Sequence, residues 1–588
     1  HHFAFGGEYI RTQNNTLTGY NENGTFAFGG GISGDGLADF LLGNWSGWDQ
    51  SRPQQVAYRQ TMMSFYGQDT IRFTPNLTVI AGLRWEPSLQ PYDYFHRGSL
   101  FSLANFQNNV HSSVYPTAPA GMLFYGDQGV PAGFTNSHWS NFGPRLGITW
   151  DPNGAGRQVV RAGYGLLYDA TMTWYSQRLT SNPPVVNEIN ITTAGCGTFS
   201  NPWLNYSIAN GCVSNSHTNQ NPFPGGFIFF PGAAQWVSLL PNMRPTYMMQ
   251  WNLAYENQFA NNWTASLSYL GSRSLHLPLS YDYNWSLNQP SVCAKFTGGC
   301  SIANEPQRRY LAQIATSAAQ GASQYGQFFI ADDTGNSNYN GMIAAIRHRF
   351  AHNFTWLANY TWSHCLSTGD FNGDLRGTYY SQQNNPAAEY ASCNFDVRHI
   401  FNTSAVASSP FIGSGFVRHL VGGWQVSPSV RVTSGLPANV TLGSDNSFSG
   451  EGTAVDRPNL NPGVPVYLNT WTTLSNGSWA YQVFNPAAFS KSAAGTFGNV
   501  SRDFLRNPGA WTVDVSISRV FPIKERFKIE GRLDMLNAFN HWNPVVPGAN
   551  WNSSNFGQVS SAPTPSFVPQ AATWNDPRVL QLAAKVTF

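Results

Sequence analysis

The sequence predicts an all-β protein, a transmembrane antiparallel β-barrel of the outer-membrane type. Charged residues make up only 11% of the 588 residues and aromatic residues reach 15%, whereas soluble domains carry about 25% charged residues. No apolar run approaches the roughly 20 residues of a membrane helix. A chain of this kind that crosses a bilayer must therefore do so as a closed barrel, in which every backbone group in lipid is paired.

The clearest strand pattern lies at the C-terminal end of the chain. Apolar residues occupy every second position over 511–517, 527–535 and 580–588, and a period of two places alternate side chains on opposite faces of a sheet. The polar face of the middle segment carries Lys528, Glu530, Arg532 and Asp534. A membrane barrel would turn these four charges toward its lumen. A soluble sandwich would turn them to water, and the alternation alone fits both.

In chain order, about fourteen strands are predicted. A strand at 3–10 is followed by a short β segment at 25–28 and a short helix at 37–42. Residues 29–34 match G-x-G-x-x-G but lack the βαβ context that a dinucleotide site requires, so a loop is expected there. The remaining predicted strands are 55–73, 77–86, 142–150, 159–168, 248–259, 263–275, 341–350, 354–363, 397–407, 424–433, the two strands of the hairpin 510–538, and a last strand ending at Phe588.

Connections between these strands alternate between short and long. Tight turns are expected near residues 75–76, 152–154, 261–262 and 352–353, and the long connections are 87–140, 170–245, 276–337, 365–396, 435–509 and 540–577. Long loops without structure argue against a compact soluble domain. Outer-membrane barrels have short periplasmic turns and long extracellular loops. If the last strand ends in the periplasm, every tight turn lies on the periplasmic side, which favours the membrane barrel.

Aromatic residues support the same interpretation. Several lie at predicted strand ends, where a membrane-interface girdle would place them, namely Trp85, Trp263, Trp362 and Trp511. The terminal Phe588, with Val586 and Leu582 on its face, is expected to act as the signal for the barrel-assembly machinery. The loop residues Trp45, Trp48, Trp203, Trp285 and Trp471 could stack on sugars or aromatic siderophores, or pack on one another.

The six cysteines fall two by two into long loops. We expect the pairs Cys196 with Cys212, Cys293 with Cys300, and Cys365 with Cys393, because pairing within a loop is simplest and an oxidising exterior permits it. Free thiols or a metal site are the alternative, but no C-x-x-C pair or neighbouring histidine cluster supports one.

No catalytic or cofactor constellation is visible, so we expect neither an enzyme nor a bound cofactor. The chain has neither H-E-x-x-H nor G-x-S-x-G. His348 and His399 are expected to pack or to join the girdle, and residues 332–336 to form a solvated loop rather than a calcium site. Lys and Arg number 32 against 30 Asp and Glu, a net charge of +2, which does not indicate a nucleic-acid partner.

Short motifs in a specific order resemble those of a known family, the Oar-like TonB-dependent outer-membrane receptors common in acidobacteria. They cover most of the chain from about residue 55 and lie at 65–69, 76–78, 82–86, 141–147, 161–165, 338–341, 395–399, 536–541, 555–558 and 576–578, with the terminal Phe588. The resemblance implies a 22-stranded barrel with an N-terminal plug, often preceded by a regulatory-like β-domain. It also implies uptake driven by the TonB–ExbB–ExbD complex.

The resemblance identifies residues 1–588 as the barrel portion of such a receptor, without signal peptide, regulatory-like domain or plug. We therefore expect a monomer in the lipid of the bacterial outer membrane that imports a siderophore, oligosaccharide or peptide. A passive pore or surface adhesin is the first alternative, and a secreted all-β carbohydrate-binding protein or hydrolase is the second. The terminal Phe588 and the one-sided long loops disfavour the second alternative.

Overall fold

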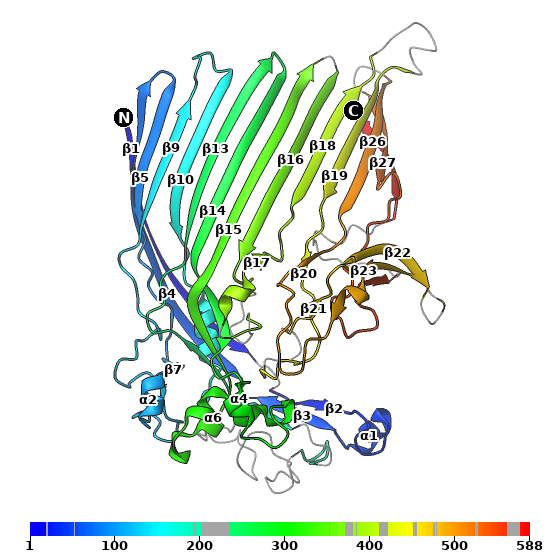
Figure 1. The fold of residues 1–588 in the computed structure, drawn as a ribbon. Coiled ribbons are helices and arrows are strands. Elements are labelled where there is room, and N and C mark those ends of the chain that lie inside the picture. The colour runs from blue at the N-terminus through cyan, green and yellow to red at the C-terminus, as the bar shows by residue number, and fades with distance from the viewer. Residues whose placement is uncertain are drawn as a thin grey trace.

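The computed structural model describes most of the chain. The described residues are all of 1–588 except 19–21, 52, 187, 192–195, 203–229, 231–233, 352, 371–379, 384, 411–420, 451–455, 474–476, 478, 524–526 and 561–576. Figure 1 shows a tall, curved sheet whose strands end in a thick layer of loops.

Over the described residues the architecture is nearly all β, and the main sheet has 17 strands. Three of these, β6 (Tyr92–Asp93), β12 (Ala234–Leu239) and β17 (Ala391–Ser392), are short additions to the sheet. The others form one antiparallel series in the order β1 (His2–Thr18), β4 (Gln54–Thr74), β5 (Leu77–Trp85), β9 (Phe142–Trp150), β10 (Gln158–Tyr168), β13 (Tyr247–Ala260), β14 (Trp263–Asp282), β15 (Tyr325–Ala351), β16 (Phe354–Ser367), β18 (His399–Ser408), β19 (Trp424–Thr433), β26 (Ala510–Pro522), β27 (Lys528–Leu536) and β29 (Val579–Thr587).

This series confirms the predicted fold class and the expected number of strands. From β4 onward, short and long connections between neighbouring strands alternate as the sequence indicates. The described tight turns, such as those between β4 and β5 and between β9 and β10, lie together at one end of the sheet (Figure 1). Among the described residues, β1 pairs only with β4 and β29 only with β27, so the series ends in two edges. The helix predicted at 37–42 is also present, as α1 (Gly36–Leu42).

The register places the two kinds of side chain on opposite faces of the sheet. Leu533 of β27 lies between Ile517 of β26 and Leu582 of β29, so aliphatic side chains form a continuous row. The same face continues through Val432, Phe401 and Tyr360 to Leu267, Trp251, Tyr164 and Leu83. Leu582 is 83% exposed and Phe588 86%. We call this the apolar face, and we call the opposite face the polar face.

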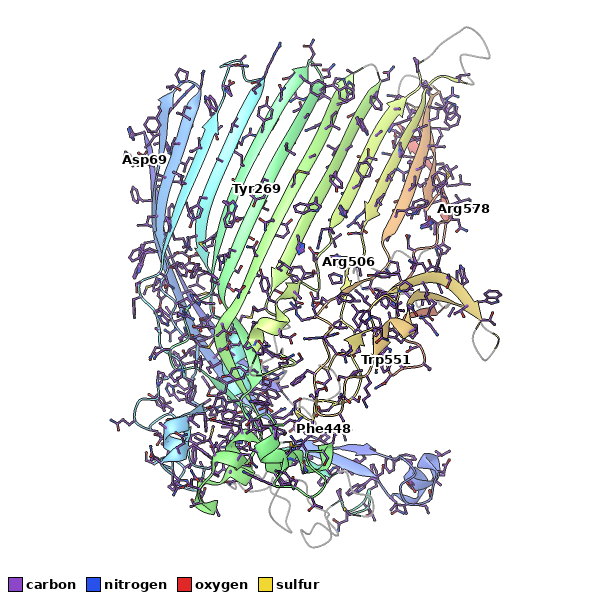
Figure 2. All side chains as sticks on the ribbon, viewed as in Figure 1. Asp69, Tyr269, Phe448, Arg506, Trp551 and Arg578 are labelled. Carbon is purple, nitrogen blue, oxygen red and sulfur yellow. A yellow bond between two sulfur atoms is a disulfide. The ribbon has the colours of Figure 1, made fainter. Side chains whose placement is uncertain are left out.

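The long connections fold into a loop layer built from short elements. Its helices are α2 (Leu103–Gln107), α3 (Thr173–Leu179), α4 (Pro290–Cys293), α5 (Glu305–Arg308) and α6 (Tyr310–Ile314). Its strands are β2 (Thr25–Ala27), β3 (Gly47–Ser51), β7 (Leu100–Phe101), β8 (Met122–Leu123), β11 (Glu188–Ile191), β20 (Pro437–Ala438), β21 (Asn459–Leu460), β22 (Tyr467–Thr473), β23 (Trp479–Phe484), β24 (Phe489–Ser490), β25 (Leu505–Arg506) and β28 (Gln558–Ser560). Figure 2 places Tyr269 among the long strands, and Phe448, Arg506 and Trp551 within the loops.

The buried apolar clusters lie mainly in this loop layer. One cluster joins the connections before β9, β13 and β15, and it includes Phe106, Met122, Trp236, Leu311 and Phe328. A second cluster joins β20, β21, β23, β24, β25 and β28, and it includes Val440, Phe484, Phe489, Leu505 and Phe556. Because these side chains are removed from water, the loops have cores of their own. The expectation that residues 435–509 form a loop without secondary structure is therefore wrong.

Three strands extend further than the sequence pattern indicates. β1 runs to Thr18 because its polar part, which includes Asn14 and Asn15, pairs with the still longer β4. β14 continues to Asp282 and β15 begins at Tyr325, with register shifts near Leu277. The stretch 332–336, expected to be a solvated loop, therefore belongs to a strand. Cross-strand pairing decides these extensions, because strand propensity depends strongly on context.

Disulfide bonds join Cys293 to Cys300 and Cys365 to Cys393. Cys212, which the third expected pair requires, lies outside the described residues. In the part of the chain that the structure describes, no helix is both long enough and apolar enough to span a membrane.

Candidate ligand-binding site

The polar face carries a series of charged side chains. Glu530 of β27 is the register partner of Lys585 of β29, so opposite charges lie side by side. Arg532 also forms an ion pair with Asp534 on its own strand, with 2.9 Å between Nε and Oδ2. Lys528, Glu530, Arg532 and Asp534 therefore lie on the face opposite to Leu533, and the nearest partners of the last three are other polar groups. Such pairing describes a polar wall and does not by itself indicate a ligand.

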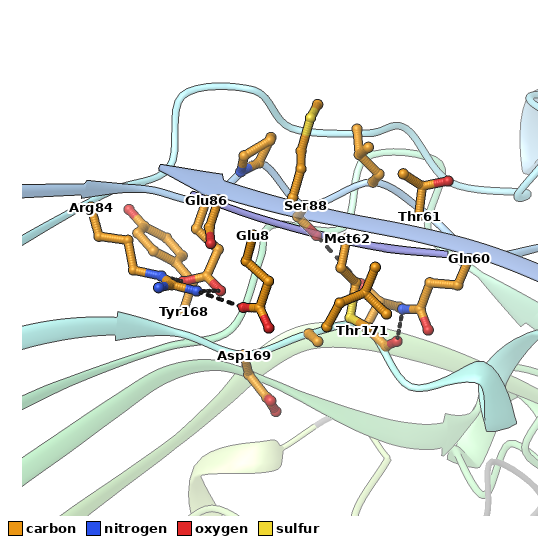
Figure 3. A pocket seen from close by; sticks show the side chains of 16 residues that line it. Glu8, Gln60, Thr61, Met62, Arg84, Glu86, Ser88, Tyr168, Asp169 and Thr171 are labelled. Atoms are coloured by element: carbon orange, nitrogen blue, oxygen red, sulfur yellow. Dashed lines mark hydrogen bonds and ion pairs between the residues drawn. The ribbon is translucent and has the colours of Figure 1, made fainter. Parts of the chain in front are cut away.

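A pocket opens on the polar face where β1, β4 and β5 approach the loop layer (Figure 3). Arg84 at the end of β5 forms an ion pair with Glu86, with 3.1 Å between Nε and Oε2, and lies 3.6 Å from Glu8 of β1. The residues that follow β10 complete the pocket. Gln60 donates a hydrogen bond of 2.7 Å to the carbonyl oxygen of Thr171, which fixes this connection against β4.

The charges around this pocket are unbalanced. Its lining includes the carboxylates of Glu8, Glu86 and Asp169 and one guanidinium, that of Arg84. Three negative charges and one positive charge give a formal net charge of −2, so the pocket favours a cationic or hydrogen-bond-donating group. The described residues contain no group of three or more metal-ligating side chains placed to hold a metal ion.

A second pocket shares Asp169, Ala170 and Thr171 with the first. On its far side, Arg244 holds Asp333 of β15 through its backbone N–H at 2.7 Å and its side chain at 2.8 Å. The first pocket encloses about 90 Å³, whereas sites for drug-sized ligands enclose roughly 300–1,000 Å³. Each pocket therefore suits one polar group of a larger molecule, and the rest of such a molecule would lie against the loops.

The loop layer is fixed to the strands by buried ion pairs. Arg457 donates to both carboxylate oxygens of Glu389, at 2.8 and 2.9 Å. Arg502 donates to the carbonyl oxygen of Ser367 at the end of β16, at 2.8 Å, and its guanidinium pairs with Asp370. These contacts join the β20–β25 connection to the connection between β16 and β18.

Burial alone would raise the pKa of the Glu389 carboxyl. The hydrogen bonds from Arg457 and Ser381 outweigh this effect and lower the pKa below its usual value. Burial likewise acts to raise the pKa of Asp396, and hydrogen bonds from Arg506 and the Cys365 backbone lower it overall. Both carboxylates are therefore charged at neutral pH and hold their arginine partners.

A further contact between loops involves two carboxyl groups. Glu305 of α5 adjoins Asp445, which lies in the connection after β19, and burial together with the neighbouring Asp445 raises the pKa of Glu305 to about 8. Arg308 is fully buried nearby and donates to the carbonyl oxygens of Leu287 and Phe448, at 2.8 Å in each case. The connections before β15 and after β19 thus meet at a protonated carboxyl and a buried guanidinium.

Comparison with known proteins agrees with this architecture. Residues 1–581 match the family model of the outer membrane beta barrel domain. The chain is an outer-membrane β-barrel domain. Its location is the bacterial outer membrane, where the apolar face contacts lipid. A comparison with curated proteins returned no match.

Solved structures similar to this barrel domain include several transporters and receptors. The outer membrane transporter YddB from Escherichia coli is 10% identical with a TM-score of 0.47, and the match covers 99% of this chain and 51% of that one. The ferripyoverdine receptor of Pseudomonas aeruginosa is 10% identical with a TM-score of 0.38, covering 91% and 39%. A variant of the ferric enterobactin receptor from Pseudomonas aeruginosa is 11% identical with a TM-score of 0.42, covering 100% and 50%. The barrel domain thus spans about half or less of the length of these proteins.

The loop tryptophans of the barrel domain fall into two groups. Trp45 and Trp48 are buried and Trp285 is half-buried, so packing is their main role. Trp471 is 51% exposed. Trp203 lies outside the described residues. The sequence alone did not decide between stacking on a ligand and packing within the protein, because aromatic residues do both.

The two histidines singled out from the sequence lie in aromatic surroundings. The ring of His348 is 4.5 Å from that of Trp263 and 5.3 Å from that of Phe354, at the turn end of the sheet. The Nδ1 atom of His399 is 2.7 Å from the hydroxyl of Tyr360. These contacts agree with the expected packing roles.

The pocket residues themselves were not singled out from the sequence. Glu8, Gln60, Arg84 and Thr171 come from separate segments. Only the pairing of β1 with β4 and of β4 with β5, and the hydrogen bond from Gln60 to Thr171, bring them together. One feature of the sequence could have indicated this pocket. Arg84 and Glu86 are charged residues at the polar positions of a predicted strand, directly before a long loop.

Proposed function

We propose that this barrel domain is the barrel portion of a TonB-dependent receptor of the Oar-like type, which imports a large scarce nutrient such as a siderophore, oligosaccharide or peptide. The remainder of such a receptor would supply the plug and the TonB-contacting segment, and the complete barrel would have 22 strands. The function is transport rather than catalysis.

One observation carries the proposal. The long connections form a loop layer with its own apolar cores and buried ion pairs, and this layer adjoins a charged pocket on the polar face. A passive pore needs an open entrance. Loops that are packed and ion-paired at the entrance instead suit a receptor that holds a ligand before it is released inward.

The pocket geometry also limits the cargo. A site of about 90 Å³ with a net negative lining accepts an amine, a guanidinium or a group of hydroxyls. The cargo would place such a group between Glu8, Glu86 and Asp169. Its bulk would contact the loops.

The first test is to sequence the DNA upstream of the codon for His1 and to translate the same frame. A signal peptide, a short TonB-contacting segment and a plug, followed by further alternating strands, would support an energised importer. A start codon close upstream with no plug would overturn the proposal in favour of a porin or an adhesin.

A second test measures transport directly. The complete reading frame would be expressed in a host with and without functional TonB, and uptake of labelled cargo would be compared. Import that requires TonB supports the proposal, whereas import that is equal in both hosts contradicts it. Folding would be checked by assembly into the outer-membrane fraction.

A further inference from the structure

Four aromatic residues, three of them exposed and one half-buried, gather on one side of the loop layer, away from the pocket. Trp471 of β22 is the register partner of Tyr481 of β23, and Trp479 lies two residues before Tyr481 on the same side of the strand. Trp542, from the connection after β27, packs against this pair. Its ring centroid is 5.3 Å from that of Trp471 and 5.5 Å from that of Tyr481. We call these four residues the aromatic platform.

The three tryptophans of the platform face solvent, whereas Tyr481 is half-buried and packs against the second apolar cluster. Ala480 and Phe484 of β23 are 1% and 0% exposed, and Phe484 belongs to the second apolar cluster. Trp471, Trp479 and Trp542 are 51%, 60% and 39% exposed. The β22–β23 hairpin is therefore anchored to the second apolar cluster through the buried side of β23. Exposed apolar surface of this kind, in contact with several other rings, marks an interaction site more often than scattered single residues do.

The two chain segments that form the platform contain no charged residue. Residues 458–490, which contain β21 to β24, include no Asp, Glu, Lys or Arg, and neither do residues 535–575, which contain Trp542. Both segments are rich in Asn, Ser and Thr. A ligand with phosphate, carboxylate or ammonium groups would find no complementary charge here. The matching ligand is neutral, presents flat apolar surface to the rings and offers hydroxyls to amide and hydroxyl side chains.

We propose that the aromatic platform binds neutral carbohydrate, with pyranose rings stacked on Trp471 and Trp542 and hydroxyl groups facing the surrounding amides. The C–H faces of a sugar ring are apolar and its rim carries hydroxyls, so it matches aromatic rings set among Asn, Ser and Thr. This site is separate from the charged pocket. It gives the barrel domain a means of attachment to polysaccharide whether or not the cargo is a sugar.

The test uses the full chain, refolded in detergent, with cellohexaose, maltohexaose, xylohexaose and laminarihexaose as probes in isothermal titration. We expect at least one of them to bind. Trp471→Ala and Trp542→Ala should each weaken that binding by about tenfold, the effect of losing one stacked ring. Trp471→Phe, which keeps an aromatic ring at this position, should retain most of the sugar binding. Trp139→Ala is the matched control, because Trp139 is an exposed tryptophan outside the platform, 56% exposed, and it should leave binding unchanged.

Three outcomes would overturn the proposal. The first is that none of the four hexasaccharides binds the unaltered chain. The second is that one binds with equal affinity in all variants. The third is that the Ala substitutions abolish binding to neutral lipid vesicles but not to sugars, which would assign the platform to the membrane surface. Because transport and sugar attachment are measured separately, failure of one does not decide the other.

Discussion

Arg457 and Glu389 form a doubly hydrogen-bonded ion pair in which both side chains are almost completely buried. The two N–O distances are 2.8 and 2.9 Å, and the side chains are 6% and 1% exposed. Glu389 precedes β17 and Arg457 precedes β21. The pair therefore joins two connections that are far apart in the sequence, and the geometry of the loop layer depends on it.

Removing one partner of this pair should loosen the loop layer. Glu389→Gln leaves the Arg457 guanidinium buried without its counter-charge, which typically costs about 3–5 kcal/mol. We expect faster hydrogen–deuterium exchange across 458–490, while the long strands stay protected. The double variant Glu389→Leu with Arg457→Met should recover most of the protection, because a buried apolar pair avoids the unpaired charge. No recovery would indicate that the pair is needed for its hydrogen bonds to Ser381 and the backbone.

The same pair predicts sensitivity to acid. The pKa of Glu389 is lowered from a reference value of 4.5 by its hydrogen bonds. Its stabilising contribution is therefore fully present above pH 4.5 and is lost as the pH falls through the lowered value. Exchange across 458–490 should accelerate below that range, and Glu389→Gln should abolish this change. Equal acid sensitivity in the unaltered protein and in the Glu389→Gln variant would contradict the role of Glu389.

The raised pKa of Glu305 predicts that the loop layer loses stability as the pH rises, opposite to the effect of Glu389. Burial and the adjacent Asp445 raise its pKa from 4.5 to about 8, so ionisation is less favourable in the folded state. The folded state therefore loses stability progressively as the pH rises from 4.5 to about 8. After correction for intrinsic rates, exchange over 284–310 and 439–450 should be faster at pH 9 than at pH 6. Glu305→Gln should remove this difference, and Glu86→Gln, in the pocket, serves as the control.

The facing of β27 predicts unequal effects of two neighbouring substitutions. Leu533 lies in the aliphatic row between Ile517 and Leu582, whereas Arg532 lies on the polar face beside Asp534. A cation at the lipid face near the bilayer centre costs about 2–4 kcal/mol. Leu533→Arg should therefore reduce the heat-modifiable, membrane-assembled form far more than Arg532→Leu does. If both variants lost the membrane-assembled form to a similar extent, this would count against the assignment of Leu533 to the lipid face and Arg532 to the polar face.

The cysteine pairs predict a specific peptide map. Digestion without reduction should recover Cys293 linked to Cys300 and Cys365 linked to Cys393, which the structure joins. We further expect Cys196 linked to Cys212. Reduction should weaken the connection between β16 and β18 most, because a 28-residue separation closes a long loop. A map with six free thiols would contradict the prediction.

Much of the barrel follows from local sequence. The strands β9 and β19 begin and end at the predicted residues, and β5 and β10 differ by one residue. The reason is that a period of two, bounded by tight turns, is fixed within one hairpin. The same pattern assigned Leu533 and Arg532 to opposite faces without knowledge of their neighbours.

The sequence by itself determined the membrane β-barrel class, the strands of the described series and the separation of short turns from long loops, because each of these depends on neighbouring residues. Only the tertiary structure decided the structure of the loops, the pocket of Glu8, Arg84 and Asp169, and the aromatic platform. Arg457 meets Glu389 across 68 residues, and Trp542 meets Trp471 across a similar distance in the chain. No local periodicity encodes such contacts, since they arise when packed loops bring separate segments together.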